Sequence, residues 1–120
     1  MSNQPDFFHG AFNFKPADHG ILHGTYLNND TPMPHPESAF RQENGDRDFR
    51  DFSGIYRTIW IEPGNEKVSA RLEIKPHHTG IPHVYELTWT AIDPQPRHGY
   101  QGLGMLQGTD LVGCYWKTTV

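Results

Sequence analysis

The stretch "KVSARLEIK" (67–75) decides the fold class, because its apolar and polar residues alternate without interruption. Successive side chains of a β-strand point to opposite faces of a sheet, so strict alternation is typical of a strand with one buried and one solvated face. We therefore predict a half-buried strand, with these four residues on its buried face: Val68, Ala70, Leu72 and Ile74.

The same alternation recurs along the chain, and little of the sequence has helical spacing. The last segment reads as two strands joined at Gly108-Thr109, where a glycine suits a tight hairpin turn. We expect about seven strands, in segments 7–14, 21–27, 53–62, 67–75 and 83–92 and in the two halves of 100–120.

Length and composition limit the possible functions. The 120 residues predict one domain, 1–120. The 10 Lys and Arg against 14 Asp and Glu give a net charge of −4 without a basic stripe, which argues against a nucleic-acid partner. No apolar run approaches the roughly 20 residues of a membrane helix, so no membrane partner is expected. The single cysteine, Cys114, and the first ten residues, which lack signal-peptide features, predict a cytoplasmic protein.

The segment from about 28 to 54 interrupts the strand pattern, because it is rich in Pro, Asn and charged residues. We expect a long irregular loop or a partly ordered lid there. The segment could contain a short helix around residues 37–44, and a disordered surface loop is the alternative that its composition allows.

Hairpin geometry indicates which side chains share a face, because residues directly opposite on antiparallel strands point the same way. A four-residue turn at 63–66 pairs Arg57 with Leu72 and draws Arg57 to the apolar face. The parity of the next strand turns His83 and Tyr85 towards the same interior.

The last hairpin is expected to place Gln101 opposite Trp116 on the core face, together with Leu103 and Met105. The outer face, where glycine accommodates strong strand curvature, then carries Gly102, Gly104 and Gly113.

The predicted fold class is all-β: an antiparallel up-and-down meander that closes into a small barrel, since closure removes exposed strand edges. An open, strongly curved sheet that dimerises is the alternative. The Gly-x-Tyr opening of "SGIYRTIWIE" and the aromatic residues Trp89 and Trp116 resemble the calycin group of small barrels, such as lipocalins and avidins, over about residues 53–120. The resemblance implies a barrel whose mouth binds a small apolar or amphipathic ligand, and it assigns no residue a role.

The predicted interior face gives six candidate ligand-binding residues: Arg57, His83, Tyr85, Trp89, Gln101 and Trp116. A buried guanidinium needs a partner, and its planar fork suits a carboxylate or phosphate. Two alternatives stay open for Arg57: it pairs with an acid such as Glu86 at the rim, or it faces solvent because the turn length differs by one residue. The two tryptophans could equally be core residues.

The segment "HHTGIPH" (77–83) holds three histidines, but their spacing matches no zinc pattern. Neighbouring His77 and His78 diverge in an extended strand, so only a turn could aim both at one ion. We predict a hairpin loop with at most adventitious nickel or zinc binding, no native metal and no cofactor.

Three function classes remain. The leading prediction is a binder of a small apolar or anionic ligand in the barrel interior. The second is a small enzyme that uses His83 and Tyr85, with Arg57 as an anion clamp, for proton transfer or isomerisation. The third is a structural or interaction module, expected as a homodimer, that dimerises through the outer face of the last hairpin, which carries Tyr100, Leu106, Leu111 and Tyr115.

Overall fold

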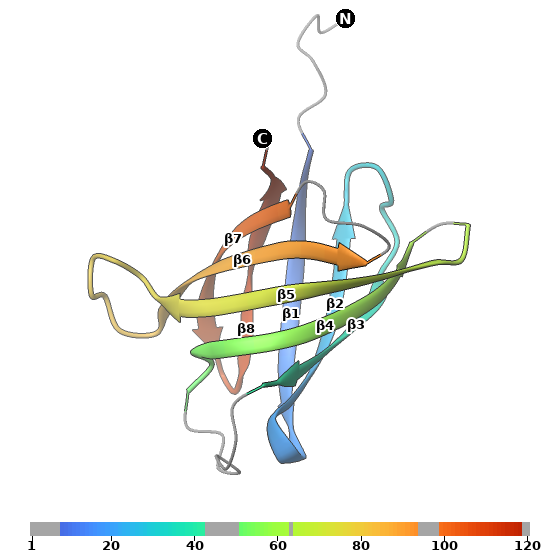
Figure 1. The fold of residues 1–120 in the computed structure, drawn as a ribbon. Helices are drawn as coiled ribbons and strands as arrows, with labels where there is room; N and C mark the ends of the chain where they lie inside the picture. The colour runs from blue at the N-terminus through green and yellow to red at the C-terminus, as the bar shows by residue number, and fades with distance from the viewer. Residues whose placement is uncertain (1–7, 43–50, 63, 94–98, 119–120) are drawn as a thin grey trace, which may run out of the picture.

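The computed structural model describes residues 8–42, 51–62, 64–93 and 99–118, and their strands form one closed antiparallel barrel (Figure 1). Each strand pairs with the next, and β8 pairs back with β1, so the closed meander is confirmed and the open-sheet alternative is wrong. The strands are β1 (His9–Ala17), β2 (Ile21–Asn28), β3 (His35–Arg41), β4 (Gly54–Glu62), β5 (Glu66–Pro76), β6 (Val84–Asp93), β7 (Gly99–Gln107) and β8 (Asp110–Lys117).

Strand β3 lies inside the segment that was expected to be irregular or helical. Its inward positions carry Glu37 and Ala39, whereas Phe40 is exposed on the outside, so its pattern of apolar residues does not show which face is buried. Pro36 also argues against a strand by composition. The expectation of a helix at 37–44 is wrong for the part that the structure describes, and residues 43–50 lie outside the described ranges.

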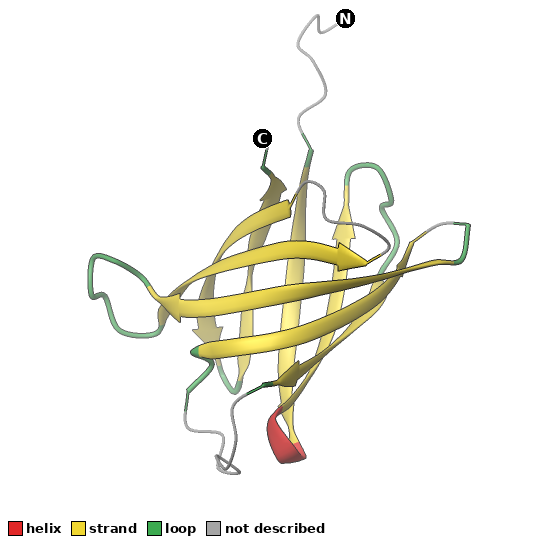
Figure 2. Cartoon of the chain, viewed as in Figure 1, coloured by secondary structure: helices red, strands yellow, loops and turns green. Residues whose placement is uncertain are grey.

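Helix is confined, in the described residues, to one short 3-10 turn, Asp18–Gly20, between β1 and β2 (Figure 2). His19 and Gly20 have φ of 65° and 73°, a conformation that reverses the chain between two strands that pair directly. Across the described ranges, no helix has the length and apolar character needed to cross a membrane.

The β4–β5 hairpin corrects the predicted position of Arg57. Glu62 pairs with Glu66, so the turn has three residues instead of four, and Arg57 lies opposite Arg71. A change of one residue reverses both faces of a strand. Arg57 is therefore exposed on the outside of the barrel, and the buried face of β4 carries Tyr56, Thr58 and Trp60.

The last hairpin has the predicted two-residue turn and pairing, but its faces are the reverse of the prediction. Strand pairing places Gly102 and Gly104 on the inner face, opposite the buried residues Leu87 and Tyr85, and large rings beside them leave little room for a side chain. A Cβ atom on Gly102 would lie 3.0 Å from Cζ3 of Trp89, and one on Gly104 would lie 3.2 Å from Cζ of Phe12. Gly113 also faces the interior, whereas Gln101 is exposed and Trp116 is half-buried on the outside.

Side chains close the end of the barrel at which β4 begins. The Tyr56 hydroxyl donates to the Phe52 carbonyl over 2.7 Å, and Arg41 Nη2 donates to the Tyr56 hydroxyl over 2.8 Å. Phe52 also packs edge-on against Tyr85, with ring centroids 6.1 Å apart. The core that this plug joins has these six apolar residues among its most deeply buried: Phe14, Leu22, Leu72, Ile74, Leu87 and Leu111.

The inward position of the glycines gives a test of the fold. A Cβ atom at residue 113 would lie 2.1 Å from the Leu103 carbonyl oxygen, and a paired backbone cannot move away as a side chain can. We expect Gly113→Ala to lower the free energy of unfolding by about 1–3 kcal/mol or more in urea denaturation. The neighbouring exposed Cys114→Ala should change it by less than about 0.5 kcal/mol. Equal stability of the two variants would contradict the close approach of the β7 backbone to Gly113.

Candidate functional site

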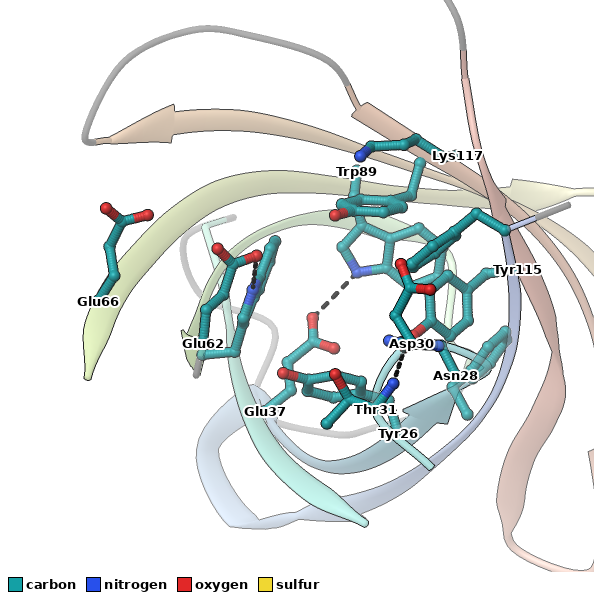
Figure 3. Close-up of a pocket in the computed structure, with 14 residues that line it drawn as sticks. Tyr26, Asn28, Asp30, Thr31, Glu37, Glu62, Glu66, Trp89, Tyr115 and Lys117 are labelled. Carbon is teal, nitrogen blue, oxygen red and sulfur yellow. Dashed lines mark hydrogen bonds between the residues drawn. The ribbon is translucent and has the colours of Figure 1, made fainter. Parts of the chain in front are cut away.

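A cavity of about 350 Å³ occupies the opposite end of the barrel, next to the β2–β3 and β4–β5 connections (Figure 3). Its volume lies within the range that small-molecule sites occupy. Aromatic rings make up much of its wall, contributed by Phe8, Phe12, Tyr26, Trp60, Trp89, Tyr100 and Tyr115.

The aromatic wall is held together by contacts between its own rings. Tyr115 lies at its centre, with ring centroids 5.8 Å from Tyr100, 5.9 Å from Trp89 and 6.4 Å from Tyr26. All three pairs are tilted or edge-to-face, the arrangements that aromatic rings prefer. Asn28 Nδ2 donates to the Tyr115 hydroxyl over 3.0 Å, so the ring is also fixed at its polar end.

The mouth of the cavity is shaped by the turn that follows β2. Asn28 Oδ1 accepts hydrogen bonds from the backbone N–H groups of Asp30 and Thr31, over 3.0 Å and 2.7 Å. An asparagine side chain that bonds the backbone two and three residues ahead stabilises a tight turn. Asn28 thus anchors both this turn and Tyr115.

Glu37 is the buried carboxyl group of the cavity, and its side chain is directed towards Trp89 (Figure 3). It is only 6% exposed. Thr58 Oγ1 and Trp89 Nε1 both donate to its Oε2 atom, over 2.5 Å and 2.9 Å. None of the hydrogen bonds made by the described residues ends on the second carboxylate oxygen, Oε1.

Burial raises the pKa of Glu37 from its ordinary value of 4.5 to about 7, and the hydrogen bonds from Thr58 and Trp89 oppose this rise. A carboxyl group whose pKa is near neutrality can accept or donate a proton under physiological conditions. A strongly shifted carboxyl group inside a cavity is also a physical indicator of a functional site.

The rim of the cavity carries more acidic than basic side chains. Asp30, Glu62 and Glu66 line it, and Lys117 is the one basic residue among the described lining residues. Lys117 Nζ lies over the Phe8 ring, 5.6 Å from its centroid.

The six candidate residues predicted from the sequence do not come together. Trp89 lines the cavity, whereas Tyr85 is buried at the plugged end, where burial and a hydrogen bond to Asp51 raise its pKa to about 12. His83 does not point inward, because it lies exposed in the β5–β6 loop with a φ of 65°. The other three are on the outer surface, as the two hairpin corrections require: Arg57, Gln101 and Trp116.

Sequence reasoning missed the polar centre of the cavity, Glu37, and much of its aromatic wall. Trp60 could have been found, because a three-residue turn at 63–65 places it opposite Val68 on the apolar face. Tyr115 could have been found by placing the glycines of the last hairpin inside. Glu37 gave no such signal, since a single acidic residue in a Pro-containing segment is typical of an exposed loop.

A second polar cluster lies on the β5–β6 hairpin, at the other end of these strands from the cavity. The turn brings His77, His78 and Glu86 together, with one potential metal-ligand atom of each within 4.8 Å of the others. His78 Nδ1 lies 2.9 Å from Glu86 Oε2. His78 is exposed, His77 and Glu86 are partly buried, and His77 also contacts Thr79 Oγ1 over 2.6 Å.

Comparisons with known proteins give no relative: no family model, no curated protein and no solved structure matches the chain. The cavity must therefore be interpreted from its own geometry.

The raised pKa of Glu37 predicts a pH-dependent stability. Because the folded-state pKa exceeds the unfolded value, this contribution is fully present below about pH 4.5 and is lost as the pH rises through about 7. At about 1.4 kcal/mol for each pKa unit, the loss is roughly 3 kcal/mol. Urea denaturation over this pH range should show the decline in the wild type and not in Glu37→Gln.

The partly exposed Glu73 provides the matched control, because its side chain lies on the outer surface beside Arg71. Glu73→Gln should keep the decline that Glu37→Gln loses. A parallel pH dependence in the wild type and Glu37→Gln would show that Glu37 ionises normally.

Proposed function

We propose that the protein binds a small aromatic or amphipathic molecule inside the barrel, with Glu37 as the polar anchor. The observation that carries this proposal is the cavity itself: about 350 Å³ between aromatic walls, lined in part by a buried carboxyl group whose Oε1 atom has no hydrogen-bond partner among the described residues.

The composition of the cavity supports a ligand more than a structural role. Apolar ligand surface that leaves water contributes about 25 cal/mol per Å², and flat aromatic walls offer much of that contact. A buried carboxyl group, in contrast, is unfavourable for folding when its charge is not compensated. A barrel with no ligand would be more stable with apolar side chains at this end, so Glu37 and the open volume indicate binding.

The architecture is consistent with this proposal. Calycin barrels, which the sequence resembles in part, are also antiparallel meanders that close around an interior with an open mouth. We keep a reducing, cytosolic setting as part of the proposal, because the chain has a single cysteine.

The structure removes residues on which two of the sequence-based hypotheses depended, the anionic ligand and the enzyme. An anionic ligand loses its proposed clamp, because Arg57 is outside the barrel, where its Nη1 lies 3.4 Å from Ser69 Oγ. The enzyme hypothesis required His83, Tyr85 and Arg57 to lie together inside the barrel. They do not, because His83 and Arg57 are exposed and only Tyr85 is buried.

The interaction-module hypothesis also loses the surface on which it was based. Tyr115 and Leu111 are buried and face the interior, as does Tyr100. Leu103 and Met105 are instead the exposed apolar residues of β7. Dimerisation stays a prediction.

Binding can be tested with N-phenyl-α-naphthylamine, an uncharged aromatic probe whose fluorescence increases in apolar surroundings. We expect the wild type to bind it at one site. Thr31 lines the mouth, so Thr31→Trp should obstruct the cavity and weaken binding at least tenfold, whereas Thr90→Trp on the exposed face of β6 should not. The affinity of each variant is measured by titrating the protein with the probe and recording the probe's fluorescence, with the probe itself excited directly.

Native mass spectrometry of the purified protein shows whether a ligand is already present. Absence of probe binding to protein that this measurement shows to be ligand-free would overturn the proposed function. Equal probe binding by the Thr31→Trp and Thr90→Trp variants would place the site elsewhere on the molecule.

A further inference from the structure

We infer that the ligand is an organic cation, in which an ammonium group attached to an aromatic or apolar body pairs with Glu37. This inference rests on the proposed function and adds the charge of the ligand to it. It depends on how Glu37 is hydrogen-bonded, on the charges around the cavity and on the rings of its wall.

The two donors to Glu37 are arranged for its ionised form. Thr58 and Trp89 direct an O–H and an N–H to the same oxygen, Oε2, and an ionised carboxylate is the form that accepts several such bonds. Yet no positively charged group of the described residues acts on Glu37, since burial and these two hydrogen bonds are the influences on its pKa. The cavity thus provides hydrogen bonds for an ionised Glu37, but the described residues do not supply the positive charge that a buried carboxylate requires.

The surroundings of Glu37 favour a cation over an anion. Three more carboxylates line the cavity at Asp30, Glu62 and Glu66, against the single Lys117 near the mouth. The negative charge of Glu37 also acts on two phenol groups of the wall. Burial is the largest cause of the raised pKa of Tyr26 and Tyr115, and the charge of Glu37 raises both further. A potential that disfavours a phenolate favours an ammonium ion.

The walls suit an organic cation in particular. Aromatic faces attract a cation through their quadrupole, and cages of aromatic side chains recognise alkylammonium groups. Trp60, Trp89 and Tyr26 line the same cavity as Glu37 and Glu62. An ammonium group at Glu37 would donate to Oε1, and its apolar body would lie against these rings.

A series of three ligands of nearly equal shape tests the charge directly: α-naphthylmethylamine, α-naphthylmethanol and α-naphthoate, which present an ammonium, a hydroxyl and a carboxylate. Binding to the full chain is measured by calorimetry at about pH 8, where Glu37 is mostly ionised. We expect the amine to bind at least tenfold more tightly than the alcohol, and the alcohol more tightly than the carboxylate.

Two variants assign the preference to Glu37. In Glu37→Gln, which keeps an oxygen acceptor for Thr58 and Trp89 but has no charge, the tenfold ratio of amine to alcohol affinity should fall to about one. Glu73→Gln, which removes a carboxylate from the outer surface, should keep the wild-type ratio. Circular dichroism of each variant establishes that the barrel is folded.

The possible results distinguish a failure of the cation inference from a failure of the proposed ligand-binding function. If the alcohol or the carboxylate binds as tightly as the amine, the ligand is not a cation, although a binding cavity remains. If the ratio survives in Glu37→Gln, the preference does not come from Glu37, and the inference is wrong. If neither these ligands nor N-phenyl-α-naphthylamine binds, the proposed function fails together with the inference.

Discussion

The pairing of β1 with β8 is the constraint on which the rest of the molecule depends. It runs from His9 opposite Trp116 to Phe14 opposite Leu111, and it converts a meander into a barrel with an enclosed interior. Inward side chains must then share a fixed volume, which explains why glycines face the large rings on the β7–β8 side. The same closure separates the two ends, one filled by Phe52 and its neighbours and the other left hollow.

If Glu37 anchors a ligand as proposed, stability and function oppose each other in this barrel. At neutral pH a buried carboxyl group of raised pKa reduces the stability of the fold, and well-packed apolar residues would avoid that loss. Residues that lower stability in a cavity are frequently those that bind or react. The physical asymmetry between the two ends of the barrel is therefore better evidence for a binding function than the volume of the cavity alone.

Alternation predicted seven of the eight strands, all except β3, and the closed all-β fold, because the barrel interior imposes a period of two on strands whose inward residues are apolar. It did not predict the cavity, since the face of a strand depends on the length of the adjacent turn. One residue fewer at 63–65 moved Arg57 outside and Trp60 inside. The glycines of β7 were misassigned for another reason: the inner face needs glycine there because Trp89 and Phe12, which belong to other strands, fill the space beside it. Neither turn length nor cross-barrel packing is encoded in a local pattern.

The hydrogen bond from Trp89 to Glu37 has an optical consequence. The indole N–H ends on the carboxylate whose charge changes near neutral pH, and the same ring forms part of the cavity wall. Indole emission responds to nearby charge, so Trp89 acts as a built-in reporter at the centre of the barrel. The protein thus carries its own spectroscopic label for the state of its most unusual residue, without any chemical modification.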